Sequence, residues 1–266
     1  MTDLDILENK SIYIIREAYA RFKNIALLWS IGKDSTTLLW LSRKAFFGSI
    51  PFPVIHIDTS FKFKEIYEFR DNYAKKWNLK LIVSQNKEAL RKGMGPEKSK
   101  LECCNALKTE ALKQTIKEYG FKALLLAIRR DEHGIRAKER YFSPRDVNFT
   151  WDYQNQPAEL WDLYNSKAGD KQHFRIHPLL HWRELDVWRY IHREKIPVTS
   201  LYYSSAHTRY RSIGCACCCA PINSDADSVS KIIRELETTR EAERSGRAQD
   251  KEDAYAMQKL RSLGYM

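Results

Sequence analysis

The sequence lacks any apolar run long enough to cross a membrane, because no window reaches about 18 uninterrupted apolar residues. It also lacks internal repeats, low-complexity stretches and the basic start with an apolar run that marks a signal peptide. Its 266 residues are 43% apolar and 30% charged, an ordinary globular composition with enough apolar chain for a sizeable core. We therefore exclude a disordered chain, a collagen-like fibre and a membrane protein, and we expect a cytoplasmic protein with one large domain, or one domain plus an appendage.

Acidic residues are in the minority: 34 Asp and Glu stand against 45 Lys and Arg, which gives a net charge of +11. Residues 220–266 contain 8 bases and 9 acids, so the whole excess lies before residue 220. Positive charge of this size indicates an anionic partner, such as a nucleotide, an inorganic anion, nucleic acid or an acidic protein. Most of the lysines fit a solvated surface, and the exception is the segment 129–145, with 6 bases and 3 acids.

Short apolar runs alternate with amphipathic segments along the first half of the chain. We expect strands at 24–29, 54–57, 80–83 and 123–128, and helices at 7–23, 35–45, 64–77 and 109–119. This alternation predicts an α/β fold with a parallel sheet and helices on both faces. After residue 145 the pattern is irregular, apart from helices expected at 182–194 and 228–247.

The sharpest motif is Ser30-Ile31-Gly32-Lys33-Asp34-Ser35, between the first strand of the sheet and the next helix. A loop in this position can direct backbone N–H groups at an anion, and the helix N-terminus adds partial positive charge. Gly32 would allow close approach of the ligand, Lys33 supplies a charge, and Ser30 and Ser35 supply hydroxyl groups. The motif is not a Walker A loop, because Leu27 stands where that loop needs its first glycine.

The loop resembles the pyrophosphate loop of the N-type ATP pyrophosphatases, Ser-Gly-Gly-Lys-Asp-Ser, which cleave ATP between its α- and β-phosphates. Asp58, at the end of the next strand, would lie at the edge where parallel sheets bind ligands. One departure is Ile31, which stands where the family usually has glycine. Because a β-branched residue does not readily hold a positive φ, we expect either a more helical loop there or an altered fit to pyrophosphate.

An arginine-rich segment follows the fourth expected strand. Arginine forks match tetrahedral oxyanions bidentately, so Arg129, Arg130 and Arg136 beside a phosphate loop would neutralise an oxyanion and the phosphates together. Arg129 and Arg130 are the stronger candidates, because they lie at the strand end. The alternative is a solvated helix with paired Glu and Arg side chains.

Longer segments carry a closer resemblance. The matching stretches are IHIDTSFKFKEIYEFRD, KTEALKQTIKEYGF, RRDEHGIRAKER, QPAELWDLYN and the ending ERSGRAQDKEDAYAMQKLRSLGYM. They look like the small subunits of bacterial sulfate adenylyltransferases, a branch of the phosphoadenosine-phosphosulfate reductase superfamily, over nearly the whole chain. The resemblance implies an adenine nucleotide alpha hydrolase-like fold. We assign a PP-loop ATP-binding domain to 1–219, and a helical tail that is the candidate partner-binding segment to 220–266.

The resemblance also implies a reaction in which ATP and sulfate give adenosine 5′-phosphosulfate and pyrophosphate. It implies an elongation-factor-like GTPase large subunit as partner, whose GTP hydrolysis helps to drive the synthesis. Sulfate has no proton to lose at neutral pH, so we expect catalysis by positioning and charge neutralisation, with Mg²⁺ on the phosphates of ATP. The expected catalytic residues are Lys33, Arg129 and Arg130. The expected nucleotide-binding residues are Ser30, Gly32, Lys33, Asp34, Ser35, Asp58 and Arg136.

The six cysteines form an adjacent pair, Cys103-Cys104, and a later group, Cys215, Cys217, Cys218 and Cys219. A Cys-Cys pair followed far downstream by Cys-x-x-Cys resembles the cluster ligands of assimilatory adenosine-phosphosulfate reductases. That resemblance implies a [4Fe–4S] cluster on Cys103, Cys104, Cys215 and Cys218. Zinc and free or redox-active thiols are the alternatives.

Three rival functions stay open at this stage. A reductase of the same superfamily needs a nucleophilic cysteine near its C-terminus, and there is no cysteine after Cys219. A sulfur-modifying enzyme of tRNA or DNA fits the charge, although no added nucleic-acid module is visible and a nucleic-acid partner is the weaker expectation. A nucleotide-binding regulatory subunit without catalysis is the third, because of Ile31.

Overall fold

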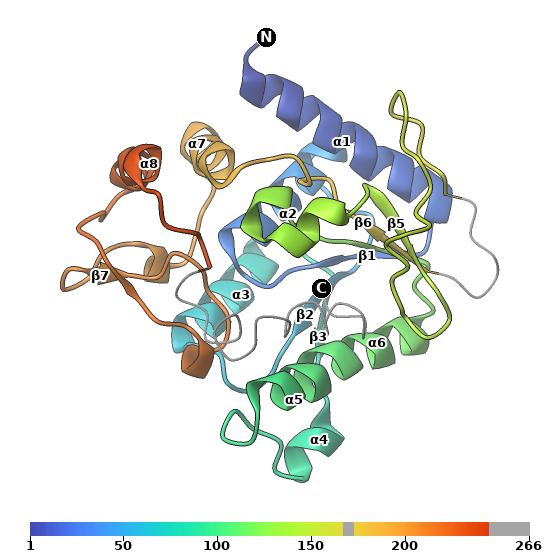
Figure 1. Cartoon of the computed structure of the whole chain (residues 1–266), viewed down its shortest axis with the longest axis horizontal. Helices are drawn as coiled ribbons and strands as arrows, with labels where there is room; N and C mark the ends of the chain where they lie inside the picture. The colour runs from blue at the N-terminus through green and yellow to red at the C-terminus, as the bar shows by residue number, and fades with distance from the viewer. Residues whose placement is uncertain (167–172, 245–266) are drawn as a thin grey trace.

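A six-stranded sheet forms the centre of the protein in the computed structural model, which describes residues 1–166 and 173–244 (Figure 1). The strand order is β3-β2-β1-β4-β6-β5. The strands are β1 (Ile25–Leu28), β2 (Val54–Ile57), β3 (Leu81–Ser84), β4 (Ala123–Leu125), β5 (Phe142–Arg145) and β6 (His173–Ile176). All neighbours pair in parallel except β5, which pairs antiparallel with β6 at the edge of the sheet.

Helices cover both faces of this sheet, as Figure 1 shows for α1 and α2 on one side and α6 on the other. The helices are α1 (Asp3–Phe22), α2 (Lys33–Ala45), α3 (Lys64–Lys76), α4 (Lys87–Arg91), α5 (Lys100–Cys104), α6 (Ala111–Tyr119), α7 (Glu184–Glu194) and α8 (Val229–Thr238). A π-helical turn, Asn105–Glu110, joins α5 to α6. The predicted α/β class, with a mostly parallel sheet between two helical layers, is confirmed.

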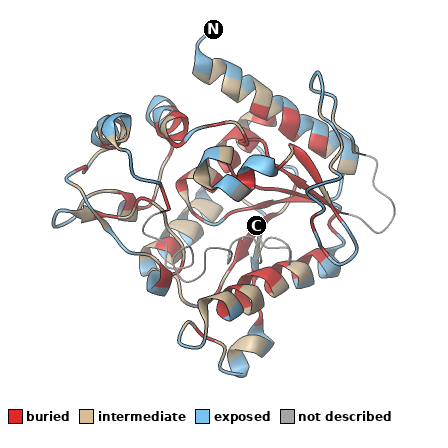
Figure 2. Ribbon diagram, viewed as in Figure 1, coloured by how far each residue is buried: buried red, intermediate tan, exposed pale blue. Residues whose placement is uncertain are grey.

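Alternate side chains of the central strand enter different hydrophobic clusters. Leu27 joins the cluster formed with α1, α2 and α7, whereas Leu28 joins the cluster formed with α6. Both faces of the strand are therefore buried, which explains why it reads as a continuous apolar run in the sequence. Figure 2 shows the buried residues concentrated on the strands and on the inward faces of the helices.

The second half of the chain departs from the sequence expectations. Strands β5 and β6 were not predicted, because they contain buried polar residues instead of an apolar run; Arg145 and Arg175 are both 1% exposed. The presence of Pro144 in β5 suits an edge strand. The helix expected at 228–247 is wrong in its extent, since α8 ends at Thr238 and the chain up to residue 244 is not helical.

The segment after residue 219 lies against the rest of the protein. A short strand β8 (Ile222–Asn223) pairs antiparallel with β7 (Thr208–Arg209), across the expected domain boundary. Ile232 of α8 is fully buried in the larger hydrophobic cluster. Residues 245–266 of the expected tail lie outside the described residues, so the division at residue 219 stays a prediction. Among the described helices, none is long and apolar enough to cross a membrane.

Candidate active site

The main pocket lies where the chain order of the sheet reverses. From β1 the chain moves outward to β2 and β3, and it then returns to β4 on the other side of β1. Open α/β sheets bind ligands at the carboxyl ends of the strands beside such a switch point. The pocket is lined here by Ser30 and Gly32 after β1, by Lys33 at the start of α2, and by Ala127 and Ile128 after β4.

The predicted phosphate loop forms the floor of this pocket. The Ser30 and Ser35 hydroxyl oxygens lie 3.0 Å apart, and the Ser35 hydroxyl also donates to the Gly32 carbonyl oxygen at 3.1 Å. Gly32 is the N-cap of α2, with a φ of −72° that any residue can adopt. A Cβ at this position would lie 3.5 Å from both the Ser30 hydroxyl and the Tyr202 hydroxyl, which is ordinary contact. Neither the backbone conformation nor a steric clash with these hydroxyls therefore requires glycine at position 32.

Ile31 adopts the conformation that its side chain disfavours. Its φ is +67°, so the expectation of a more helical loop at this position is wrong. The side chain is 1% exposed and belongs to the larger hydrophobic cluster. Burial of the side chain therefore holds the backbone in the left-handed region, at a cost of the order of 1–2 kcal/mol.

Two buried cations and a bridging carboxylate lie at the loop. Lys33 is 1% exposed, and its Nζ lies 3.1 Å from Asp34 Oδ2, within ion-pair contact of Glu243, and 4.0 Å from Glu184 Oε1. Arg129 is fully buried, with its Nε 2.7 Å from Asp34 Oδ1 and its two terminal nitrogens on Asp131 and Glu243. The structure thus brings together two of the predicted catalytic residues, Lys33 and Arg129, and holds both with carboxylates.

These contacts fix the charge state of the cluster. Burial alone would lower the pKa of Lys33, but the carboxylates of Asp34, Glu243 and Glu184 outweigh it and raise the pKa above its ordinary value. Burial likewise would raise the pKa of Glu243, but Arg129 and Lys33 outweigh it and hold the pKa well below its usual range. Both groups are therefore charged throughout the neutral range.

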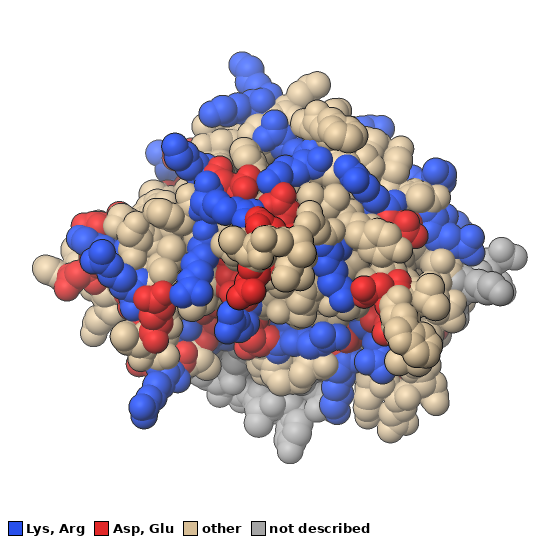
Figure 3. Space-filling model, turned by 90° about the horizontal axis from the view of Figure 1, so that it is seen from above, with Lys and Arg blue, Asp and Glu red and all other residues tan. Residues whose placement is uncertain are grey.

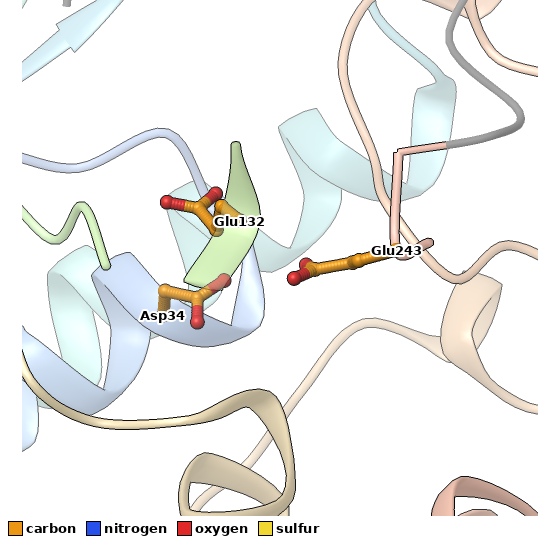
Figure 4. Close-up of side chains that lie close together, drawn as sticks. All are labelled: Asp34, Glu132 and Glu243. Carbon is orange, nitrogen blue, oxygen red and sulfur yellow. The ribbon is translucent and has the colours of Figure 1, made fainter. Parts of the chain in front are cut away.

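Three carboxylates converge on this point from distant parts of the chain. Figure 4 shows Asp34, Glu132 and Glu243 directed toward one another. One ligand oxygen of each lies within 4.8 Å of those of the others, and no other group of three His, Cys, Asp or Glu in residues 1–166 and 173–244 is so close. Glu132 is also paired with Arg136, which lines the pocket. Burial would raise the pKa of Glu132, but Arg136 and Arg129 lower it.

Three predicted site residues are absent from the pocket lining, namely Arg130, Asp58 and the fully buried Arg129. The Arg130 guanidinium lies 5.7 Å from the centre of the Tyr141 ring, and one of its nitrogens is 3.4 Å from the Glu139 carbonyl oxygen. The Asp58 carboxylate accepts hydrogen bonds from the Ser60 N–H and the Tyr67 hydroxyl, each at 2.8 Å. The roles expected for all three stay predictions.

Several pocket residues were not predicted from the sequence. The Tyr202 hydroxyl accepts a hydrogen bond from the Lys33 backbone N–H at 2.8 Å, and burial raises the pKa of Tyr202 to about 12. Lys108 enters the pocket from the π-helical turn, a type of irregular turn that is frequent at functional sites. The remaining charged lining residues outside the predicted set are Lys62, Glu132, Glu243 and Arg244. None of these had a local signal in the sequence, because each depends on how distant segments meet.

The cysteines gather beside the same pocket. Cys103 and Cys104 end α5, and Cys215 precedes the short turn Ala216–Cys218. Burial, together with the neighbouring Cys104 and Cys215 thiols, raises the pKa of Cys103 to about 12, so the two cysteine segments lie side by side. Gly214 and Lys108, which adjoin these segments, both line the pocket. In the described part of the chain, however, no three thiols come within 4.8 Å of one another.

The surface charge is mixed on the face that Figure 3 shows. Lys and Arg side chains alternate there with Asp and Glu, and no continuous basic track crosses that face. A nucleic-acid footprint is a basic patch or stripe. That face therefore gives no support to the nucleic-acid-modifying alternative.

The family that this chain resembles is well defined. The sequence profile of the phosphoadenosine phosphosulfate reductase domain matches residues 24–221. A protein named sulfate adenylyltransferase subunit 2 from Colwellia psychrerythraea is 39% identical, over 100% of this chain and 99% of its own length. Its counterparts from Psychromonas ingrahamii and Geotalea daltonii are each 40% identical, over 100% of this chain and 98% of theirs.

Solved structures show the same fold at lower identity. A phosphoadenylyl-sulfate reductase from Candida auris, in a phosphate complex, is 19% identical with a TM-score of 0.55, over 81% of this chain and 96% of its own. The Candida glabrata FMN adenylyltransferase in complex with ATP is 19% identical with a TM-score of 0.55, over 80% of this chain and 61% of its own. These likenesses establish the fold, and the relatives identical at about 40% establish the branch. The chain therefore belongs to the sulfate adenylyltransferase subunit 2 family, within the phosphoadenosine phosphosulfate reductase domain superfamily.

Proposed function

We propose that this protein transfers the adenylyl group of MgATP to sulfate, giving adenosine 5′-phosphosulfate and pyrophosphate. The observation that carries the proposal is the position of Lys33. Its charged side chain lies at the N-terminus of α2, beside Arg129 and at the switch point of the sheet. This is where a helix terminus and two cations together stabilise phosphate oxygens.

The proposed reaction requires no proton transfer by the protein in the attack of sulfate. A sulfate oxygen attacks the α-phosphorus, and the bond from that phosphorus to the oxygen bridging to the β-phosphate breaks. Because sulfate is fully ionised at neutral pH, no general base is needed. Lys33 and the α2 N-terminus would hold the departing pyrophosphate, and Arg129 and Arg136 would reduce the repulsion between sulfate and the α-phosphate.

Magnesium enters this scheme as part of the substrate. Carboxylate oxygens are the side-chain ligands that Mg²⁺ prefers. Asp34 and Glu132 lie close together at the loop and offer such oxygens. We infer that they contact the metal of MgATP once the nucleotide is bound.

The partner follows from the names of the relatives, since a "subunit 2" implies another subunit. We propose that this other subunit is an elongation-factor-like GTPase, because formation of a phosphosulfate anhydride is uphill and needs a second source of free energy. The segment 220–266 is the proposed contact. Within it, α8 buries Ile232 and turns Lys231 and Arg234 to solvent.

We also propose that Cys103, Cys104, Cys215 and Cys218 hold a [4Fe–4S] cluster. These four thiols are buried in a common region, where metal binding would deprotonate them. Zn–S bonds of about 2.3 Å would bring four tetrahedral sulfurs to within about 4 Å of one another. No three of the described thiols come within 4.8 Å of one another, which is wider than a single zinc ion would hold them, so we favour the cluster. When bound, the cluster would add charge beside Lys108.

The adenylyl transfer is tested by co-expressing the chain with its GTPase partner and measuring pyrophosphate release. We expect release that needs ATP, GTP and sulfate together, and that is lost in Lys33→Gln. Lys64→Gln is the matched control, because Lys64 pairs with Glu68 on an exposed helix face. Thioredoxin-dependent sulfite formation from adenosine 5′-phosphosulfate, without any sulfate-dependent pyrophosphate release, would instead establish the reductase alternative.

A further inference from the structure

The carboxylate of Glu243 occupies the place that the proposed function gives to a phosphate group. One of its oxygens accepts from Lys33 Nζ, and the other accepts from Arg129 Nη2. The residue is 8% exposed and lines the pocket. It comes from the chain beyond α8, 210 positions away from Lys33. A single side chain thus bridges both cations that would hold the nucleotide phosphates.

The charged groups around the Glu243 bridge disfavour the binding of a second anion. The acidic groups facing it are Asp34, Asp131, Glu132 and Glu184, and the cations are Lys33, Arg129, Arg136, Arg211 and Arg244. Both cations of the bridge are already neutralised by Glu243 and Asp34. A triphosphate that entered with Glu243 in place would meet a buried carboxylate between the two cations, and like charges at contact distance in a buried site repel strongly.

The segment that carries Glu243 lies outside the helices and the sheet. It follows the end of α8 without regular structure, and Glu241 and Ala242 within it are exposed. A hydrogen bond of 2.9 Å from Arg211 Nη1 to the Glu241 carbonyl oxygen ties it to the domain. Arg211 is itself held by Glu184 at 2.7 Å, so this tether does not depend on Glu243. Because the Glu243 carboxylate bonds to the side chains of Lys33 and Arg129, breaking these two bonds breaks no backbone hydrogen bond of α8 or of the sheet.

We propose that Glu243 is an internal anion that closes the phosphate site, and that it must release Lys33 and Arg129 before the phosphates of ATP bind. This inference rests on the proposed function, because it assigns regulation to the same site. It makes the ligand-free enzyme a closed state, in which Glu243 competes with the nucleotide phosphates for Lys33 and Arg129. Any partner that draws the segment away from the pocket would raise the affinity for ATP, as expected for a ligand-competent state that is only partly populated.

The test uses the full chain and two ligands, inorganic pyrophosphate and MgATP, measured by calorimetry. Glu243→Gln keeps the shape of the side chain and removes its charge. We expect this variant to bind pyrophosphate about tenfold more tightly than the unmodified chain, a change of ~1.4 kcal/mol. Glu241→Gln removes the same charge from an exposed position on the same segment, and we expect its affinity to be unchanged.

The outcomes separate this proposal from the proposed function. If the unmodified chain binds MgATP and Glu243→Gln binds pyrophosphate no more tightly, the internal anion is refuted and the adenylyltransferase assignment is untouched. If neither form binds either ligand, the nucleotide site is wrong and the closing role falls with it. Tighter binding of pyrophosphate without sulfate-dependent turnover in the partner complex would support the internal anion and contradict the reaction.

A second measurement covers the case in which Glu243→Gln does not fold. When MgATP displaces Glu243 from the unmodified chain, the neighbouring buried side chain of Arg244 should become accessible to trypsin. We expect cleavage after Arg244, located by mass spectrometry, to be faster with MgATP than without it, whereas cleavage after the exposed Arg240 serves as the internal control. Cleavage after Arg244 that is equally fast or slower with MgATP would overturn the proposal.

Discussion

Ile31 offers the sharpest test of how this chain keeps its phosphate loop in shape. Replacing it with alanine removes a buried side chain and keeps a residue that disfavours the observed φ of +67°. Truncation of a buried isoleucine to alanine costs about 2–5 kcal/mol. Replacing it with glycine loses a further methyl group, worth ~0.8 kcal/mol, and about 0.4–1 kcal/mol through the freer unfolded chain. Glycine also removes the left-handed penalty of about 1–2 kcal/mol.

The terms that separate the two variants therefore nearly cancel. We expect Ile31→Gly and Ile31→Ala to have free energies of unfolding within about 1 kcal/mol of each other, as measured by urea denaturation with equal slopes. Ile25 is the matched control, because it is 1% exposed on β1 and is not among the positive-φ residues. There the glycine variant should be less stable than the alanine variant by about 1–2 kcal/mol. A gap of the same size at both positions would refute the left-handed conformation of Ile31.

Three further predictions concern buried polar groups. Tyr202→Phe leaves the Lys33 backbone N–H without its acceptor, and we expect it to lower the free energy of unfolding by about 1–3 kcal/mol in urea. His56 is fully buried and burial lowers its pKa to about 4, so the unfolded chain takes up a proton below pH ~6.5 that the folded chain refuses. The free energy of unfolding should thus fall as pH drops from about 6.5 to about 4, by ~2 kcal/mol per such histidine at pH ~5. His56→Gln should make the dependence of the free energy of unfolding on pH less steep. An unchanged pH dependence would contradict the buried neutral form of His56. Arg145→Met removes the ion pair of 2.8 Å between Arg145 and the fully buried Glu139. We expect the free energy of unfolding to fall by about 3–5 kcal/mol in thermal or urea denaturation, and an unchanged stability would contradict the importance of this pair.

The centre of the fold could be predicted because its strands are buried on both faces. All four residues of β1 and of β2 are buried, so each strand appears in the sequence as an apolar run bounded by polar residues. The strand expected at 123–128 ends at Leu125, because Ala127 and Ile128 already line the pocket. The edge of the sheet was missed for the opposite reason. Strand β6 is buried and contains His173 and Arg175, whose polarity suggests a surface segment until the fold supplies their surroundings.

The residues of the candidate site also fall into a group that could be predicted from local sequence and a group that could not. Lys33 and Arg129 could be predicted, because a strand end followed by a helix start is a local pattern in the sequence. Glu243 and Tyr202 could not, since each reaches Lys33 from a position far along the chain. Ile31 is a third case. Its departure from the family pattern was visible in the sequence, but the sequence could not show whether Ile31 would adopt a positive φ or the loop would become more helical. The outcome depends on the buried hydrophobic cluster around the Ile31 side chain.

The central claim is that Lys33 and Arg129 hold the phosphates of ATP while sulfate attacks the α-phosphorus. The most direct measurement is ³²P transfer from [α-³²P]ATP to adenosine 5′-phosphosulfate by the complex with its GTPase partner. The account predicts labelled adenosine 5′-phosphosulfate only when sulfate is present, and none from Lys33→Gln with an intact fold. Labelled product from Lys33→Gln at the unmodified rate, or no sulfate-dependent product from the unmodified complex, would contradict it.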